Sequence, residues 1–166
     1  MKEIFGSLGI SYFIDEKRSL ISNPLIEYLR AAVLICADDY SYEGIFRLLK
    51  CPLSGIDRNL TDRLENYVLG CGIRGKKKWQ ADFYRAYAGE DPAEVPELNR
   101  LRKEICGLLE PLSDVFSKRG STVLEKTAAL YEFCERSGVY EKLNAMKDGF
   151  DADGRPELVQ IGRAHV

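Results

Sequence analysis

A short glycine-rich and basic stretch, residues 70–79 with the sequence GCGIRGKKKW, has the residue types that could bind a phosphate group. Its three glycines satisfy the dinucleotide-binding pattern G-x-G-x-x-G. Residues 70–77 also satisfy the P-loop pattern G-x-x-x-x-G-K-[ST], except that Lys77 stands where a hydroxyl should hold the nucleotide's metal ion. Both patterns indicate phosphate binding only where a strand precedes the glycines and a helix follows them.

The sequence before these glycines argues against a nucleotide site. Apolar residues recur there at helical spacing from about Asp57 onward, namely Leu60, Leu64, Tyr67, Val68 and Cys71. A helix in this place cannot supply the strand that either pattern requires. We therefore favour a helix end, with Gly70 or Gly72 in the left-handed conformation and the lysines in solvent.

The positive charges of the same stretch leave a second interpretation open. The candidate DNA- or partner-binding residues are Arg74, Lys76, Lys77 and Lys78. With the aromatic residues Trp79 and Tyr84 nearby, these cations could contact a nucleic-acid backbone or an acidic partner surface. Aromatic residues beside lysines also serve as core anchors. Contact with phosphates and simple solvation therefore both remain open.

The overall composition limits the classes of partner. The chain has 166 residues, of which 45% are hydrophobic, so it can bury a core of its own. Its 24 basic and 26 acidic residues give a net charge of −2, so no overall field attracts nucleic acid or a membrane. The sequence lacks a signal-peptide pattern and a segment of transmembrane length, which predicts a cytoplasmic protein with no membrane partner.

Catalytic and metal-binding residues are not predicted. The five cysteines stand at wide spacings without a C-x-x-C pair: Cys36, Cys51, Cys71, Cys106 and Cys134. We interpret them as reduced thiols, four of them as small buried hydrophobic residues, with Cys71 less certain because it lies in the glycine-rich turn. Acidic neighbours such as Asp38 and Asp39 are interpreted as turn or capping residues. No cofactor-binding residue is assigned.

The C-terminal residues 160–166, QIGRAHV, do not resemble a natural protein end. Their reverse translation matches a common sequencing-library adapter that begins within the Gln160 codon. We expect the natural sequence to end near Val159, and we exclude this tail from fold and function arguments. His165, the single histidine of the chain, then carries no chemistry.

Helices dominate the elements that must position these residues. The expected helices cover residues 24–37, 42–50, 57–71, 79–87, 98–116, 123–137 and 139–147. Asn23 is the expected cap of the first helix, and Thr122 with Glu125 forms a capping-box pattern. Pro111 predicts a kink or a break in the helix that contains it.

One short strand is expected, over residues 9–15 with the sequence GISYFID. A single strand cannot satisfy its backbone hydrogen bonds, so its sheet partners are expected outside this sequence. An acidic linker over residues 88–97 divides the helical region into two halves. The predicted fold is therefore mainly α, with one unpaired strand.

Three stretches carry a resemblance to a known family: GISYFIDEKRSLISNPLIEYLRAAV, YSYEGIFRLLK and LENYVLGCGIRGKKKW. In order and spacing they resemble AddB (RexB) of the AddAB-type ATP-dependent helicase/deoxyribonucleases. That family characteristically has G-I-P-Y-F-I-D before an N-P-L-I-E helix. Here Ser11 replaces the proline, which loosens the turn into the strand. The resemblance is strong over residues 4–79 and weaker but continuous to about residue 159.

The resemblance implies an internal fragment of a superfamily 1 helicase-like protein. Residues 1–20 would end an incomplete α/β motor-like domain, and residues 21–159 would form a bundle-like helical insertion domain, divided near residues 88–97. The intact family complex is an enzyme, a helicase and exonuclease that processes DNA double-strand breaks for recombinational repair. Its implied partners are AddA and DNA, as double-stranded ends and single strands. Its implied cofactors are ATP, magnesium and a 4Fe-4S cluster.

None of the family's nucleotide-binding, nuclease or cluster-binding residues maps onto this sequence. The resemblance therefore implies a segment that is structural or guides DNA, without catalysis of its own. One competing hypothesis is a freestanding α-helical adaptor for a protein partner, against which the unpaired strand argues. The other is a small nucleotide-binding enzyme, for which the glycines are the sole support.

Overall fold

The computed structural model describes residues 23–84 and 92–152, and all regular structure in these two ranges is helical. Their seven α-helices are α2 (Pro24–Ala37), α3 (Tyr42–Lys50), α4 (Arg58–Cys71), α5 (Lys76–Gln80), α6 (Val95–Ser117), α7 (Val123–Arg136) and α8 (Val139–Ala152). Two short 3₁₀ helices are η2 (Pro52–Ser54) and η3 (Pro92–Glu94). The mainly α class is confirmed. The strand expected over residues 9–15 lies outside the described residues.

Local capping signals fix the starts of several helices. The Asn23 side chain accepts the backbone N–H of Leu25 at 2.9 Å, at the N-terminus of α2. At the start of α7, Glu125 Oε2 accepts the Thr122 N–H at 2.7 Å, and Thr122 Oγ1 accepts the Glu125 N–H at 3.2 Å. These contacts satisfy N–H groups that have no partner within their helices. Both predicted caps are confirmed.

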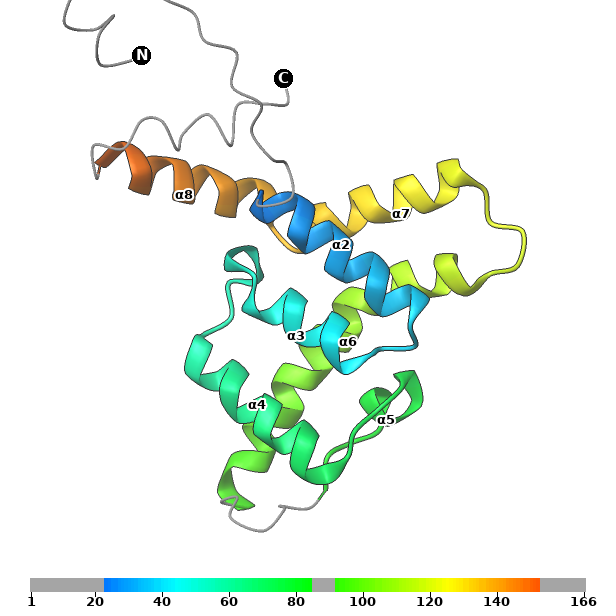
Figure 1. Cartoon of the computed structure of the whole chain (residues 1–166), viewed down its shortest axis with the longest axis vertical. Helices are drawn as coiled ribbons and strands as arrows, with labels where there is room; N and C mark the ends of the chain where they lie inside the picture. Colours follow the sequence, from blue (N-terminus) through cyan, green and yellow to red (C-terminus); the bar gives the residue numbers. More distant parts are fainter. Residues whose placement is uncertain (1–22, 85–91, 153–166) are drawn as a thin grey trace, which may run out of the picture.

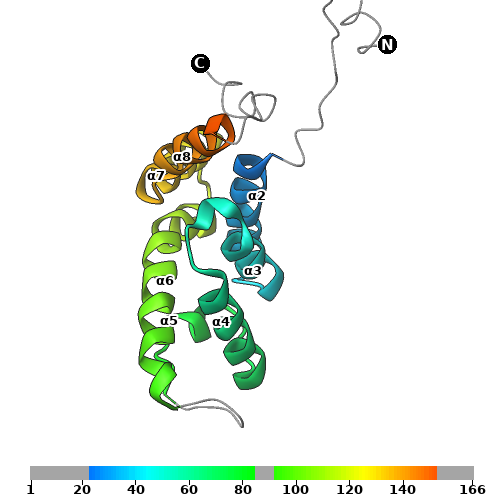
Figure 2. The ribbon, with the colours of Figure 1, turned by 90° about the vertical axis from the view of Figure 1, so that its left-hand side faces the viewer.

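The longest helix, α6, has 23 residues and forms the spine of the molecule (Figures 1 and 2). Helix α4 lies beside the beginning of α6, and α5 packs against α6. Helices α2 and α3 pack on each other, and α2 also contacts α6. Helix α7 turns back against α6, and α8 follows it beside η2.

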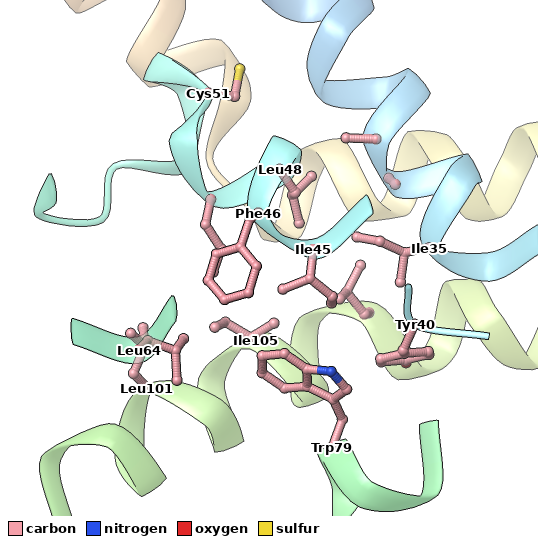
Figure 3. Packing of buried hydrophobic residues seen from close by; sticks show 14 of the residues in the cluster. Ile35, Tyr40, Ile45, Phe46, Leu48, Cys51, Leu64, Trp79, Leu101 and Ile105 are labelled. Carbon is pink, nitrogen blue, oxygen red and sulfur yellow. The ribbon is translucent and has the colours of Figure 1, made fainter. Parts of the chain in front are cut away.

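Buried side chains from both described ranges form one hydrophobic core. Figure 3 shows its central part, where side chains of α2, α3, α4 and α6 meet around Trp79 of α5. Its largest fully buried members are Trp79, Tyr28, Tyr40, Tyr67, Phe133, Ile35, Ile45, Leu53, Leu64, Leu98, Leu109 and Leu112. The ring of Tyr28 on α2 stacks on that of Phe133 on α7, with centroids 5.3 Å apart. The basic segment, residues 70–79, thus joins the core through Trp79.

A kink or a break was predicted at Pro111; helix α6 is continuous through this residue, so the break does not occur. Proline cannot donate to the carbonyl four residues earlier, which here belongs to Gly107. That carbonyl instead accepts a hydrogen bond from Nη2 of Arg136 on α7, at 2.8 Å. Leu109 and Leu112, on either side of the proline, are buried. Packing and the arginine together offset the missing backbone bond.

Candidate nucleic-acid interface

The basic segment begins at the C-terminus of α4, where the chain reverses at Gly72. Gly72 has φ 61° and ψ 43°, the left-handed conformation that glycine adopts without steric cost. The N–H of Ile73 then donates to the carbonyl of Val68 at 2.9 Å, which satisfies a free carbonyl of the last turn. Gly70 lies inside α4. The predicted helix end is confirmed, and a helix occupies the place where a nucleotide motif requires a strand.

Gly75 allows α5 to begin against the turn that follows α2. Its φ of 80° and ψ of 153° lie in a region that is almost exclusive to glycine. A Cβ built on Gly75 would lie 2.7 Å from Oδ2 of Asp39. The other carboxylate oxygen of Asp39 accepts the backbone N–H of Lys76 at 3.1 Å. The sequence alone marked Asp39 as a turn residue but not its contact with α5.

Replacing Gly75 with alanine is expected to lower the free energy of unfolding by about 2–3 kcal/mol, because backbone strain and the Asp39 contact act together. Gly72→Ala is the matched control, since its built Cβ meets nothing within 4 Å. The Gly72→Ala control is expected to lower the free energy of unfolding by about 1 kcal/mol, because the left-handed backbone is its one source of strain. Urea unfolding followed by Trp79 fluorescence measures both. Equal losses would contradict the steric role of Asp39.

Two of the four candidate cations are engaged within the fold. The Nζ of Lys76 donates to Oδ1 of Asp114 at 2.8 Å and to the hydroxyl of Ser113 at 3.1 Å, both on α6. The Nζ of Lys78 donates to the carbonyl of Gly72 at 2.7 Å. Lys76 therefore joins α5 to α6, and Lys78 closes the turn at the end of α4.

The other two cations, Arg74 and Lys77, extend into solvent. Within residues 23–84 and 92–152 neither side chain has an ion pair or a hydrogen bond. The turn between α4 and α5 holds both in place through the contacts of Lys76 and Lys78. The basic corner is defined as Arg74 and Lys77 together with this turn. It is the part of the predicted site that remains available to a ligand.

The helix expected over residues 79–87 has a different register, because α5 covers Lys76–Gln80 and ends there. The predicted basic loop is therefore itself mostly helical. Arg102 of α6 donates from Nη1 to the carbonyls of Trp79 at 2.9 Å and Gln80 at 3.1 Å. The Oδ1 of Asn99 accepts the N–H of Phe83 at 2.8 Å. These side chains take the backbone groups that a longer helix would use.

The two aromatic residues singled out beside the cations differ in exposure. Trp79 is fully buried and belongs to the core, so it is a core anchor. Tyr84 is 84% exposed. Tyr84 lines a hollow of about 180 Å³ between the end of α4 and the segment after α5; its other lining residues are Tyr67, Cys71, Ile73, Lys78, Ala81, Asp82 and Phe83. Of the four candidate cations, Lys78 is the one that lines this hollow with Tyr84.

Comparison with known proteins identifies the family. No family model matches the chain. Three relatives are each named as the B subunit of an ATP-dependent helicase/deoxyribonuclease. The protein from Lachnoclostridium phytofermentans is 33% identical over 163 residues, which cover 93% of this chain. The protein from Clostridium novyi is 36% identical over 162 residues (96% of this chain), and the one from Bacillus subtilis is 31% identical over 172 residues (93% of this chain). The chain is homologous to a segment of AddB. The resemblance seen in the sequence is confirmed.

The chain spans 14% of the length of the first two relatives and 15% of the third. This AddB segment therefore matches a small part of each relative. Helices α2 to α8 are the structure that corresponds to that part. The activity named for the relatives belongs to proteins about seven times as long.

The cysteines of the described AddB segment are partly or fully buried. No disulfide joins any of the five cysteines, and burial raises the pKa of Cys36 to about 11, which disfavours a reactive thiolate at neutral pH. No group of three or more His, Cys, Asp or Glu side chains in the two described ranges could hold a metal ion. Among the described helices, none is long and apolar enough to cross a membrane.

Proposed function

We propose that this chain is a helical, non-catalytic part of an AddB protein, and that its basic corner guides DNA. The observation that carries this proposal is that neighbouring cations differ in their contacts. Lys76 and Lys78 fix the turn, whereas Arg74 and Lys77 remain solvated on it. A cation on a fixed turn loses less conformational freedom when it binds a phosphate than one on a mobile loop.

The wider context of the proposal follows from the homology. The intact protein would act as an ATP-dependent helicase and exonuclease that processes DNA double-strand breaks for recombinational repair in the bacterial cytoplasm. AddA and DNA would be its partners. Residues 1–20 would belong to the motor-like domain and residues 21–159 to the helical insertion. The described donor groups do not fit the magnesium or the 4Fe-4S cluster that the family implies, so we assign both to other parts of AddB or its complex.

The double variant Arg74→Glu/Lys77→Glu is expected to weaken the binding of single-stranded DNA at least tenfold. Each phosphate contact to a single strand contributes about 0.7 to the slope of log K against log salt, so the slope should fall by about 1 to 1.5. The measurement is fluorescence anisotropy of a labelled oligothymidine, titrated with the full chain at several salt concentrations. Lys76 and Lys78 are left unchanged because their reversal would also disturb the fold.

The matched control is Arg58→Glu/Arg119→Glu. Both arginines are exposed and lie outside the basic corner, at the start of α4 and after the end of α6. The control changes the net charge by the same amount as the test variant. If both double variants bind with the same affinity and salt slope, the basic corner does not guide DNA, and its cations are only solvated.

Protein contact is the second candidate function, and an exposed face of α7 favours it. Val123, Leu124 and Tyr131 are 81%, 78% and 67% exposed. Their positions lie within one third of the helix circumference, at about 100° per residue. An apolar face of this kind is typical of a surface that another polypeptide covers. It is compatible with DNA guidance, since the basic corner lies on α4 and α5.

A further inference from the structure

Helix α2 carries apolar side chains on two opposite sides. The side that faces the core consists of Tyr28, Ala31, Ala32 and Ile35. The other side, the outer face, consists of Ile26, Leu29, Val33, Leu34 and Ala37. At about 100° per residue, the outer face is centred about 180° around the helix from the buried set. A helix that is apolar all round is normally covered on every side.

The outer face of α2 lines a hollow of about 500 Å³. Its four largest side chains are partly buried, but none of them forms or packs against the core of the described residues: Ile26, Leu29, Val33 and Leu34. Figure 2 shows α2 at one side of the molecule, with no described helix on its outer side. Within residues 23–84 and 92–152, the outer face is therefore open to a further partner.

The charged groups beside this hollow favour an apolar occupant. The lining includes two cations, Arg30 and Arg47. Nη1 of Arg30 lies 3.0 Å from Oε1 of Glu27. Nε of Arg47 lies 3.9 Å from Oε2 of Glu27, and its Nη2 lies 3.6 Å from Oε1 of Glu43. Both cations already face carboxylates, so a phosphate or an acidic peptide would have to compete with them. Apolar side chains would gain burial against the outer face without this competition.

The sequence directly before α2 has the composition of such an occupant. Residues 4–14, IFGSLGISYFI, include seven large apolar or aromatic side chains. Residues 15–22, DEKRSLIS, connect them to Asn23, the cap of α2. Eight residues span at most about 28 Å, and the 14 residues of α2 make a helix about 21 Å long. The covalent connection therefore keeps residues 4–14 within reach of the whole outer face.

We propose that residues 4–14 pack on the outer face of α2 and supply the cover that this helix lacks. Side chains alternate along a strand, so Ile10, Tyr12 and Ile14 share one face of the strand predicted over residues 9–15. That face is apolar throughout and would contact the outer face, which leaves both edges of the strand for the expected sheet. The contact would join the motor-like domain to the helical insertion at α2. It does not depend on the basic corner, so either proposal can fail without the other.

The test is a double-mutant cycle in the full chain, measured as shifts of the urea midpoint by Trp79 fluorescence. The outer-face variant is Val33→Ser, and the segment variant is Tyr12→Ser/Ile14→Ser. Each is expected to lower the midpoint by at least about 0.3 M, because each removes apolar contacts. Their combination is expected to lower it little further than the larger single effect, since the second change removes a contact that is already lost. Val123→Ser on α7, whose side chain is 81% exposed, is the matched control, and its effect should simply add to that of the segment variant.

Two results would overturn this packing. The first is a pair of additive shifts for Val33→Ser and the segment variant, as in the control. Leu29→Ser provides a second position on the outer face and is expected to couple to the segment variant in the same way. The second result concerns the oligomeric state, because light scattering of the unmodified chain is expected to show a monomer. A dimer that Val33→Ser dissociates would show that a second copy of the chain covers the outer face instead.

Discussion

An Arg102→Met variant is expected to lose about 3 kcal/mol of the free energy of unfolding. The Arg102 side chain is 3% exposed and forms an ion pair with Asp82. Its Nη1 also donates to the carbonyls of Trp79 and Gln80, and its Nε donates to Asn99 at 3.0 Å. Methionine would fill much of the same space but would leave these acceptors without their donors. The cost lies at the lower end for a broken buried pair, because Asp82 is 68% exposed and water can solvate it.

Urea unfolding followed by Trp79 fluorescence measures this loss, since Trp79 is the single tryptophan of the chain. Arg100→Met on the same helix is the matched control, because that side chain is 71% exposed. The control is expected to change stability by less than about 0.5 kcal/mol. Arg102→Lys should be intermediate, since one ammonium group keeps the charge but cannot reach all the acceptors. A loss below about 1 kcal/mol in Arg102→Met would contradict the network's structural role.

Helix positions were predictable from sequence where the signal is local. Asn23 and Thr122 cap the helices that begin beside them because their side chains reach N–H groups two or three residues away. The apolar periodicity of α6 likewise lies within one helix. Such interactions depend on neighbouring residues, so the chain itself carries the information.

The register of α5 and the course of α6 depended on residues far away in sequence. Helix α5 ends at Gln80 because Arg102 and Asn99, about twenty residues later, take the backbone groups that follow. Helix α6 passes Pro111 because Arg136 supplies a donor to the carbonyl that proline cannot satisfy. No sequence pattern near Trp79 or Pro111 indicates these partners. An arginine in an amphipathic helix is normally solvated, so neither Arg102 nor Arg136 stands out in the sequence.

The candidate site shows the same division. The run of positive charge was visible in the sequence, and its four cations were equivalent there. Asp114 and the Gly72 carbonyl distinguish them, since one engages Lys76 and the other Lys78. The hollow beside Tyr84 is lined by Phe83, which α6 holds in a non-helical segment that periodicity had assigned to a helix. The engaged and the solvated residues of a site that depends on tertiary contacts can be distinguished only once the fold is known.

Replacing Trp79 with alanine is expected to lower the free energy of unfolding by about 4 kcal/mol. The side chain is fully buried, and its ring lies between those of Phe46 and Phe83, at centroid distances of 6.5 and 6.3 Å. Truncation would remove its packing and leave a cavity where α3, α5 and α6 meet. Far-UV circular dichroism during urea unfolding measures the loss, since this variant has no tryptophan.

Trp79→Phe is the discriminating variant. Phenylalanine keeps an aromatic ring in the core and removes Nε1, which has no hydrogen-bond partner in the described part of the chain. Its cost is expected to be about 1–2 kcal/mol, because the loss of volume is partly offset by removal of an unsatisfied N–H. Since Trp79 is a core anchor, Trp79→Phe should also leave DNA affinity unchanged. A folded Trp79→Phe variant with weakened DNA binding would contradict that role and place the tryptophan at the DNA interface.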